Sequence, residues 1–182
     1  MKTAILVNGI PASGKSTVAR GVADRLGCPL MTLDTIKDPL FEHVGVGDRE
    51  HNRMLGRASY AIIFKAIGDW PDPAIVVIDA WFGFQPVEVL DAHLVAAGIG
   101  RTAEIWCHVP ADVVAERYRA RLGTRSVGHP GEAYLPELIA LSARATPIGG
   151  RSRFDVETTQ PIPFDTIMPW LDDVVNDRLN KA

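Results

Sequence analysis

The chain has 182 residues, of which 47% are hydrophobic and 23% charged, and 19 basic side chains stand against 22 acidic ones. This length fits one or at most two domains and supports a core without help from a metal or a disulfide. The formal net charge of −3 argues against a protein that binds long nucleic acids or anionic membranes, because those partners select cations clustered over a whole face. The two cysteines, Cys28 and Cys107, stand far apart and indicate neither a disulfide framework nor a zinc site. With no signal-peptide core and no apolar run of membrane-spanning length, we expect a cytoplasmic protein without membrane contact.

Short apolar segments alternate with longer segments of helical periodicity, which is typical of a parallel sheet covered by helices. Strands are predicted at residues 3–8, 30–33, 75–79, 104–109 and 153–157. Helices are predicted at residues 15–26, 35–44, 49–67, 87–97, 111–122, 134–143 and 163–179. In the third helix we expect an inward stripe of Met54, Ala58, Ala61, Ile62 and Ala66. The pattern predicts one doubly wound α/β domain over residues 1–182, with a glycine-containing lid at about residues 117–133.

A glycine-rich loop matching G-x-x-x-x-G-K-[ST] connects the first predicted strand to the first predicted helix. In such a loop, backbone N–H groups and the positive end of the helix converge on one phosphate. We expect Lys15 to reach the β- and γ-phosphates and the Ser16 hydroxyl to coordinate Mg²⁺. The motif therefore predicts binding of a nucleoside triphosphate, the alternative being a turn without a ligand. The candidate nucleotide-binding residues here are Gly9, Ala12, Ser13, Gly14, Lys15, Ser16 and Thr17.

A phosphate-binding loop is shared by kinases, GTPases and motor ATPases, so other residues must separate these classes. The sequence has no Asn-Lys-x-Asp motif, which a GTPase would use to bind guanine. The chain is also shorter than the larger ATPases require. A small kinase is the class that fits best.

Acidic and aromatic residues follow two of the predicted strands, at the sheet edge where ligands bind in open parallel sheets. Asp34 follows the second strand, where a carboxylate can accept a proton from an acceptor hydroxyl and orient the attacking oxygen. It also fits as the N-cap of the helix predicted from residue 35. Asp79 ends the third strand and is a candidate for holding Mg²⁺ or positioning the acceptor. Trp81 and Phe82 come next and form either the apolar wall of an acceptor pocket or part of the core.

The predicted lid contains a cluster of arginines: Arg117, Arg119, Arg121 and Arg125. A guanidinium delivered by a closing lid stabilises the charge that spreads over the equatorial oxygens during phosphoryl transfer, and closure excludes water. We expect this role for Arg125 and for Arg121, which would contact the nucleotide, whereas Arg119 is expected on a solvated helix face. A second row recurs every four residues on the third helix and is either a solvated face or a surface that binds an anionic acceptor. It consists of Arg49, Arg53 and Arg57.

These features resemble the small P-loop kinases grouped with chloramphenicol phosphotransferase, the zeta-toxin kinases and the kinase half of polynucleotide kinase, and most of all the small bacterial ATP-binding kinases of this group. The resemblance covers nearly the whole chain and is carried by residues 6–17, 33–36, 39–41, 77–80, 114–117, 123–125, 129–131 and 155–159. It implies a P-loop NTPase fold whose five-stranded parallel sheet has the order 2-3-1-4-5. It also implies that Asp34 is the catalytic base, that Arg125 lies near the phosphates and that residues 155–159 lie beside the adenine. The acceptor region, residues 45–70 and 81–87, departs from the pattern and leaves the substrate open.

The sequence therefore predicts a kinase, dependent on ATP and Mg²⁺, that phosphorylates a hydroxyl of a small molecule such as an antibiotic, a sugar or a metabolite. Two alternatives stay open: a kinase of nucleic-acid ends or nucleotide-sugars, and a regulatory protein that binds ATP without transferring its phosphate. The acidic composition disfavours a nucleic-acid partner, and the choice between a monomer and a homo-oligomer stays open. In the leading hypothesis the catalytic residues are Asp34, Lys15 and Arg125, the metal-binding residues are Ser16 and Asp79, and the acceptor-binding residues are Asp34, Asp79, Trp81 and Phe82.

Overall fold

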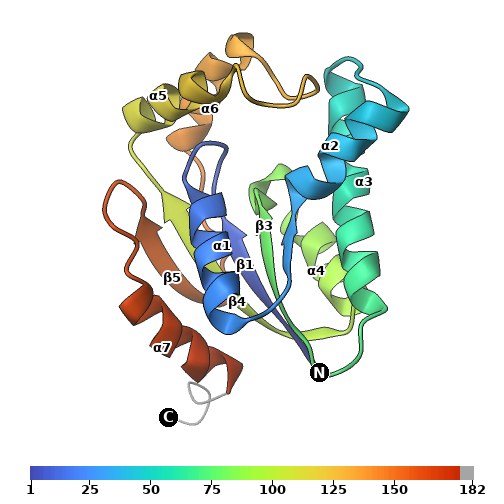
Figure 1. The fold of residues 1–182 in the computed structure, drawn as a ribbon, viewed down its shortest axis with the longest axis vertical. Helices are drawn as coiled ribbons and strands as arrows, with labels where there is room; N and C mark the ends of the chain where they lie inside the picture. The colour runs from blue at the N-terminus through green and yellow to red at the C-terminus, as the bar shows by residue number, and fades with distance from the viewer. Residues whose placement is uncertain (177–182) are drawn as a thin grey trace.

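The computed structural model describes residues 1–176 and shows an α/β fold built on a parallel sheet (Figure 1). Within these residues the sheet has five strands in the order β2-β3-β1-β4-β5, which confirms the predicted order. The strands are β1 (Lys2–Asn8), β2 (Leu30–Thr32), β3 (Ile75–Ala80), β4 (Ile99–His108) and β5 (Ser152–Glu157). The helices are α1 (Lys15–Leu26), α2 (Leu33–Val44), α3 (Arg49–Gly68), α4 (Val87–Ala96), α5 (Ala111–Arg121), α6 (Leu135–Ser142) and α7 (Phe164–Val175), with short 3-10 turns η1 (Phe82–Phe84) and η2 (Glu132–Tyr134).

Most element boundaries agree closely with the prediction, and the exceptions are the starts of β4 and α2 and the end of the last helix. β4 begins at Ile99, five residues before the predicted start, because its first half continues the pairing with β1. The helix predicted at 163–179 corresponds to α7, and its residues 177–179 lie outside the described residues. No helix in residues 1–176 combines the length and the apolarity that crossing a bilayer requires.

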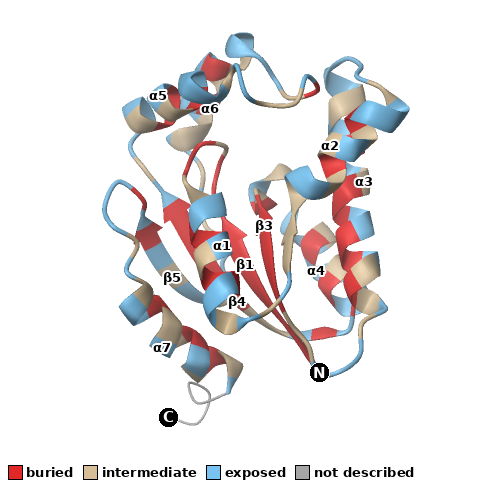
Figure 2. Cartoon of the chain, viewed as in Figure 1, coloured by how far each residue is buried: buried red, intermediate tan, exposed pale blue. Residues whose placement is uncertain are grey.

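Both faces of the sheet are covered, because consecutive residues of a strand point to opposite sides and helices lie on each side. All seven residues of the central strand β1 are buried. Ala4 and Leu6 pack in a cluster with α3 and α4, whereas Ile5 and Val7 pack with α1 and α7. Figure 2 shows buried residues concentrated in the strands and on the sides of the helices that face them. A third cluster joins α5 and α6 to the loop after β1, which anchors these helices beside the glycine-rich loop.

Three strand ends meet at one edge of the sheet and are held there by buried hydrogen bonds. Asp79 of β3 lies opposite Thr32 of β2, and the residue after Asp79 lies opposite Asn8 of β1. The Asn8 amide donates to the fully buried Glu104 of β4 at 2.8 Å, and the Asn8 Oδ1 accepts from the backbone N–H of Phe82 at 3.1 Å. One asparagine therefore fixes the start of the glycine-rich loop relative to the turn after β3.

The alternative role of Asp34, as the N-cap of a helix starting at residue 35, is wrong. α2 begins at Leu33, and its N-cap is Thr32, whose Oγ1 accepts a hydrogen bond from the backbone N–H of Thr35 at 3.0 Å. Thr32 is extended and ends β2, so the chain passes from strand to helix without an intervening loop. Asp34 instead lies in the first helical turn, where the helix dipole favours a negative charge.

The predicted inward stripe of the third helix is also wrong. The side chains of Met54 and Ile62 are exposed in α3, at 46% and 42%. Larger apolar side chains lie further round the helix, and burying them removes more nonpolar area from water than burying an alanine-rich stripe would. The buried side consists of Leu55, Gly56, Ser59, Tyr60, Ile63, Phe64 and Ile67.

Candidate active site

The glycine-rich loop between β1 and α1 has a backbone that its glycines make possible. Gly14 has a φ of 82° and is the N-cap of α1, where it has no side chain to occupy the free N–H groups of the first turn. A Cβ at Gly14 would lie 2.6 Å from Thr158 Oγ1, and one at Gly9 would lie 2.6 Å from the Cys107 carbonyl oxygen. Burial raises the pKa of the Cys107 thiol to about 12, so this side chain behind the loop stays neutral and is no nucleophile. Because no side chain caps the helix at Gly14, the first turn of α1 is open to an anion, as phosphate binding requires.

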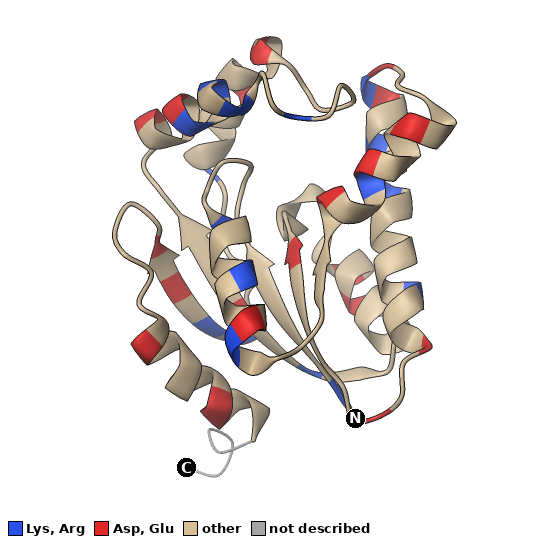
Figure 3. Ribbon diagram, viewed as in Figure 1, with Lys and Arg blue, Asp and Glu red and all other residues tan. Residues whose placement is uncertain are grey.

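A cavity of about 1000 Å³ opens at the carboxyl ends of the strands and extends from the glycine-rich loop to α3. This volume is at the upper end of the range for ligand pockets, which suits a nucleotide together with a small acceptor. Figure 3 shows charged residues of both signs on α2 and α3 to one side and on α5 and α6 to the other. The predicted site residues that line the cavity are Ala12, Lys15, Ser16, Asp34, Asp79, Trp81, Arg121 and Arg125.

Some predicted site residues lie elsewhere. Ser13 is fully buried behind the loop, and Gly9 and Gly14 shape the backbone rather than the cavity wall. Thr17 lines a smaller hollow with Ser16 on the outer side of α1. The row Arg49, Arg53 and Arg57, which the sequence left open, lines the cavity at its α3 end.

Asp79 presents an uncompensated carboxylate oxygen at the end of β3. The residue is 5% exposed, and among the described residues its Oδ1 has no hydrogen-bond partner. A buried acceptor without a partner is unfavourable and indicates a missing ligand at this point of the cavity wall. Residues 1–176 contain no cluster of three or more His, Cys, Asp or Glu side chains that could hold a metal by themselves. A carboxylate and the Ser16 hydroxyl are oxygen donors that fit Mg²⁺, which typically takes the rest of its ligands from water and phosphate.

The aromatic residues of the turn after β3 lie in different places, Phe82 in the core and Trp81 and Phe84 in the cavity wall. Phe82 is 5% exposed and packs in the core with α3 and α4, so its predicted role in acceptor binding does not fit its position. Its backbone N–H bonds to the side chain of Asn8, and the 3-10 turn that follows directs Phe84 to the cavity instead. Phe84 stacks on Tyr60, with ring centroids 6.2 Å apart and planes 6° apart. Burial raises the pKa of Tyr60, whose neutral hydroxyl donates to the Trp81 carbonyl at 2.5 Å.

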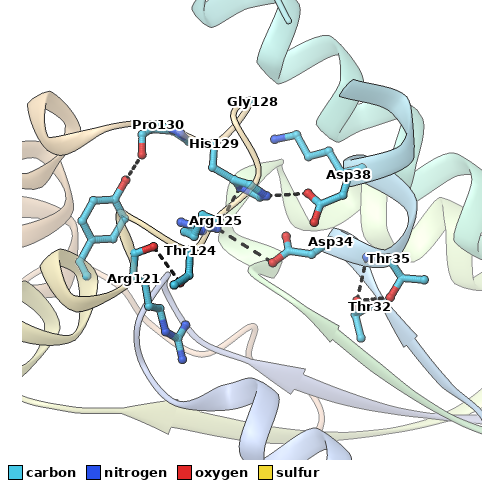
Figure 4. Close-up of polar contacts among 12 residues, drawn as sticks. Thr32, Asp34, Thr35, Asp38, Arg121, Thr124, Arg125, Gly128, His129 and Pro130 are labelled. Atoms are coloured by element: carbon cyan, nitrogen blue, oxygen red, sulfur yellow. Dashed lines mark hydrogen bonds and ion pairs between the residues drawn. The ribbon is translucent and has the colours of Figure 1, made fainter. Parts of the chain in front are cut away.

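The loop after α5 reaches across the cavity to α2 (Figures 1 and 4). Arg125 Nη2 lies 4.0 Å from Asp34 Oδ2 and 2.9 Å from His129 Nδ1. His129 Nε2 lies 2.7 Å from Asp38 Oδ1, and its side chain is only 7% exposed. From α3, the Asn52 amide donates to the Gly128 carbonyl at 2.5 Å. The predicted lid arginine and the predicted base are thus neighbours, and the contacts around them involve Asp38 and Asn52, which the sequence did not single out, and His129, which lies in a segment that carries the family resemblance.

The base of the predicted lid is joined to the glycine-rich loop through Thr158, which follows β5. Arg117 donates to the hydroxyl and to the carbonyl of Thr158, both at 2.8 Å. The Thr158 hydroxyl in turn donates to the Ser13 carbonyl at 2.6 Å. Arg117 therefore supports the phosphate loop from outside, while Arg121, one turn further along α5, lines the cavity. In the sequence, Thr158 is indicated only as part of residues 155–159, the segment that resembles the one beside the adenine in the related kinases.

The sheet order, the phosphate-binding loop before α1 and the cavity at the strand ends together define a nucleotide-binding P-loop fold of the kinase type. The chain belongs to the AAA domain family AAA_33, whose model matches residues 5–144. A crystal structure of a candidate kinase from Chloroflexus aurantiacus is 25% identical, with a TM-score of 0.77 and coverage of 95% of this chain and 98% of that one.

Two further solved kinases share the fold. A gluconokinase from Sinorhizobium meliloti is 19% identical, with a TM-score of 0.63 and coverage of 99% of this chain and 98% of that one. A shikimate kinase from Aquifex aeolicus is 16% identical, with a TM-score of 0.55 and coverage of 98% and 99%. Uncharacterized proteins of Mycobacterium tuberculosis and Mycobacterium bovis are each 29% identical over 132 residues, which is 66% of this chain and 26% of those proteins. The matched region is therefore about a quarter of the length of these curated relatives.

Proposed function

We propose that this protein is a kinase that uses ATP and Mg²⁺ to phosphorylate a hydroxyl group of a small molecule. The observation that carries the proposal is that Lys15, Asp34 and Arg125 line one cavity, although they come from α1, α2 and the loop after α5. Transfer to a hydroxyl needs a carboxylate beside the phosphate-binding groups, because the attacking oxygen must lose its proton. The names of the gluconokinase and shikimate kinase neighbours support a small-molecule acceptor.

In the proposed reaction the acceptor hydroxyl oxygen attacks the γ-phosphorus, the bond to the bridging oxygen of ADP breaks, and the hydroxyl proton passes to the Asp34 carboxylate. Lys15 and the backbone N–H groups at the start of α1 bind the phosphates. Arg121 and Arg125 stabilise the negative charge on the group in transfer. When bound, Mg²⁺ supplies further neutralisation of the phosphate oxygens, and Ser16 and Asp79 would hold it.

We assign residues 1–182 to one kinase domain with residues 117–133 as its lid, in the group of chloramphenicol phosphotransferase, the zeta-toxin kinases and polynucleotide kinase. The bonds from His129 to Asp38 and from Asn52 to Gly128 support the lid assignment, because they join the loop after α5 to helices on the other side of the cavity. Closure of this segment would exclude water from the transfer step.

The substitution Asp34→Asn tests the proposal. It keeps the shape of the side chain and removes the base, so acceptor-dependent ADP release should fall by about 100-fold or more while the affinity for an ATP analogue is retained. Asp112→Asn is the matched control, because Asp112 is also an acidic residue in the first turn of its helix but is exposed and lies outside the cavity. Unchanged turnover in Asp34→Asn would remove the proposed base. ATP binding without transfer to any hydroxyl compound would instead support a regulatory ATP-binding protein.

A further inference from the structure

Lys37 is a buried cation in the cavity wall, and no carboxylate of the described residues lies within ion-pair distance of it. It lies on α2, one helical turn after Asp34, and is 9% exposed. Its Nζ donates to Asn52 Oδ1 at 2.8 Å, and it takes part in none of the ion pairs within 4.0 Å that residues 1–176 form with one another. An ammonium has three donors, and lysine is rarely buried unless it is paired. Burial lowers the pKa of Lys37 and so does the charge of Arg125, whereas the charges of Asp34 and Asp38 raise it.

The space around the Lys37 ammonium is kept open by a glycine. A Cβ at Gly56 of α3 would come within 3.9 Å of the Lys37 Nζ and 3.4 Å of the Phe84 ring. A side chain larger than alanine at position 56 would therefore occupy the space between the Lys37 ammonium and the Phe84 ring. Lys37 lines the cavity, and its Nζ also lies 5.3 Å from the centroid of the Phe41 ring, a contact that adds no hydrogen-bond acceptor to Asn52 Oδ1.

Further cations line the same end of the cavity and are only partly neutralised. Arg53 and Arg57 share one carboxylate, that of Glu50, at 4.0 and 2.8 Å. Arg144, which follows α6, lines the opposite wall and joins none of the ion pairs seen within residues 1–176. Arg49 also lines this end and pairs with Glu137, and Asp48 adds a further carboxylate. The five cations at this end, Lys37, Arg49, Arg53, Arg57 and Arg144, therefore face three carboxylates, Asp48, Glu50 and Glu137, in a protein whose net charge is −3.

Building on the proposed kinase function, we infer that the acceptor carries an anionic oxygen group, a carboxylate or a phosphate, which binds Lys37 and faces Arg53. Residues three apart on a helix have Cβ atoms about 5–6 Å apart on one face, so the anionic group lies only a few bonds from the hydroxyl that Asp34 deprotonates. The acceptor is thus a small hydroxy acid or a small phosphorylated alcohol. Its anionic group supplies the counter-ion that Lys37 lacks.

The experiment compares compounds that differ only in the anionic group: glycerol with glycerate and glycerol 3-phosphate, and sorbitol with gluconate. Calorimetry measures their affinities for the protein saturated with Mg²⁺ and a non-hydrolysable ATP analogue. We expect an anionic member to bind about 10- to 100-fold more tightly than its neutral counterpart, and Lys37→Met and Lys37→Gln to remove this difference without changing the affinity for the analogue. The glycerate and glycerol 3-phosphate arms distinguish carboxylate from phosphate. Lys65→Met is the matched control, since Lys65 is an exposed lysine of α3 outside the cavity.

Equal affinity for charged and neutral members, no binding of any member, or an unchanged preference in the Lys37 variants would each overturn the inference. ADP release with neutral members as acceptors and no anionic preference would uphold the kinase and refute the anion site. Anion binding at Lys37 without ADP release would uphold the anion site and refute the kinase function. Thermal unfolding separates binding from a structural role: Lys37→Gln keeps a donor for Asn52 Oδ1 and removes the buried charge, so it should melt at the same or a higher temperature, and a clear drop would count against the inference.

Discussion

We predict that His129 fixes the position of Arg125, the arginine of the proposed lid, through its Nδ1. A guanidinium only donates hydrogen bonds, so the 2.9 Å contact from Arg125 requires an unprotonated Nδ1 on His129, and the ring proton lies on Nε2 facing Asp38. Burial lowers the pKa of His129 below 6.5, and the positive charge of Arg125 lowers it further, while Asp34 and Asp38 oppose the shift. His129 is therefore neutral at physiological pH. Protonation would place an N–H on Nδ1 against the donors of Arg125.

The substitution His129→Phe keeps a ring against Phe41, which His129 meets edge-on at 5.6 Å, and removes both nitrogens. The lost hydrogen bond has one charged partner, which is worth roughly 1.5–3 kcal/mol, so kcat/KM for acceptor-dependent ADP release should fall about 10- to 100-fold at mildly alkaline pH. His129→Asn retains an acceptor near the position of Nδ1 and should keep most of the activity. The affinity for an ATP analogue separates this effect from unfolding.

The pH dependence has a definite sign. Because the pKa of His129 is lower in the folded protein than the unfolded value of 6.5, the neutral ring's contribution to folding stability is complete above pH 6.5 and is lost as the pH falls through the folded pKa. We expect kcat/KM to decline over the same range, with a midpoint below 6.5, and this decline to be absent in His129→Asn. His43→Asn is the control, since His43 is an exposed histidine of α2 that binds only the Pro39 carbonyl among the described residues.

Nitrogen-15 spectra of the imidazole give a test that does not depend on turnover. They should show an unprotonated Nδ1 and a protonated Nε2 at neutral pH. A proton on Nδ1 would refute the reasoning at its first step. An acid decline of unchanged midpoint in His129→Asn would refute the assignment to His129 even if the tautomer were correct.

Two other substitutions address the phosphate loop and the metal site. Gly14→Ala forces a left-handed φ of 82° on a residue with a Cβ, at about 1–2 kcal/mol, and meets the Thr158 hydroxyl at 2.6 Å, so calorimetry should show at least about tenfold weaker binding of an ATP analogue. Retained affinity would contradict the role given to the glycine. Asp79→Asn removes the buried carboxylate, and titration of ADP release with Mg²⁺ should show a half-maximal concentration raised about tenfold or more, with unchanged or higher thermal stability. An unaltered Mg²⁺ titration would remove Asp79 from the metal site.

The fold was predictable because its signals are local and strong. The apolar run that forms β3 and the periodicity of α1 need no knowledge of the rest of the chain. The start of α2 was missed because Thr32 and Asp34 both suit an N-cap, and the choice depends on how β2 leads into the helix. The buried side of α3 was missed because apolar residues occur on two of its sides, and only packing against α2 and α4 selects one.

The residues that organise the site could not be predicted in the same way. Lys37 meets Asn52 from 15 positions away, Arg117 meets Thr158 from 41, and His129 meets Asp38 from 91. Each is an ordinary polar residue on a helix or in a loop until the fold supplies its partner. The lid arginine is different, since its spacing in an arginine-rich segment after a P-loop already indicates a phosphate ligand.

Asn52 connects Lys37, the cation of the proposed acceptor site, to the proposed lid. Its Oδ1 accepts from Lys37 at 2.8 Å, and its Nδ2 donates to the Gly128 carbonyl at 2.5 Å. The two ends of an amide are not interchangeable here, because a flip would place an oxygen against the Gly128 carbonyl and an NH₂ against an ammonium. The hydrogen bond from Asn52 to the Gly128 carbonyl and the one from Lys37 to Asn52 therefore require the same orientation of the Asn52 amide. If residues 117–133 act as the proposed lid, an acceptor whose anionic group binds Lys37 would meet the cation in the orientation that the Asn52–Gly128 bond supports, so acceptor binding and lid closure should favour one another.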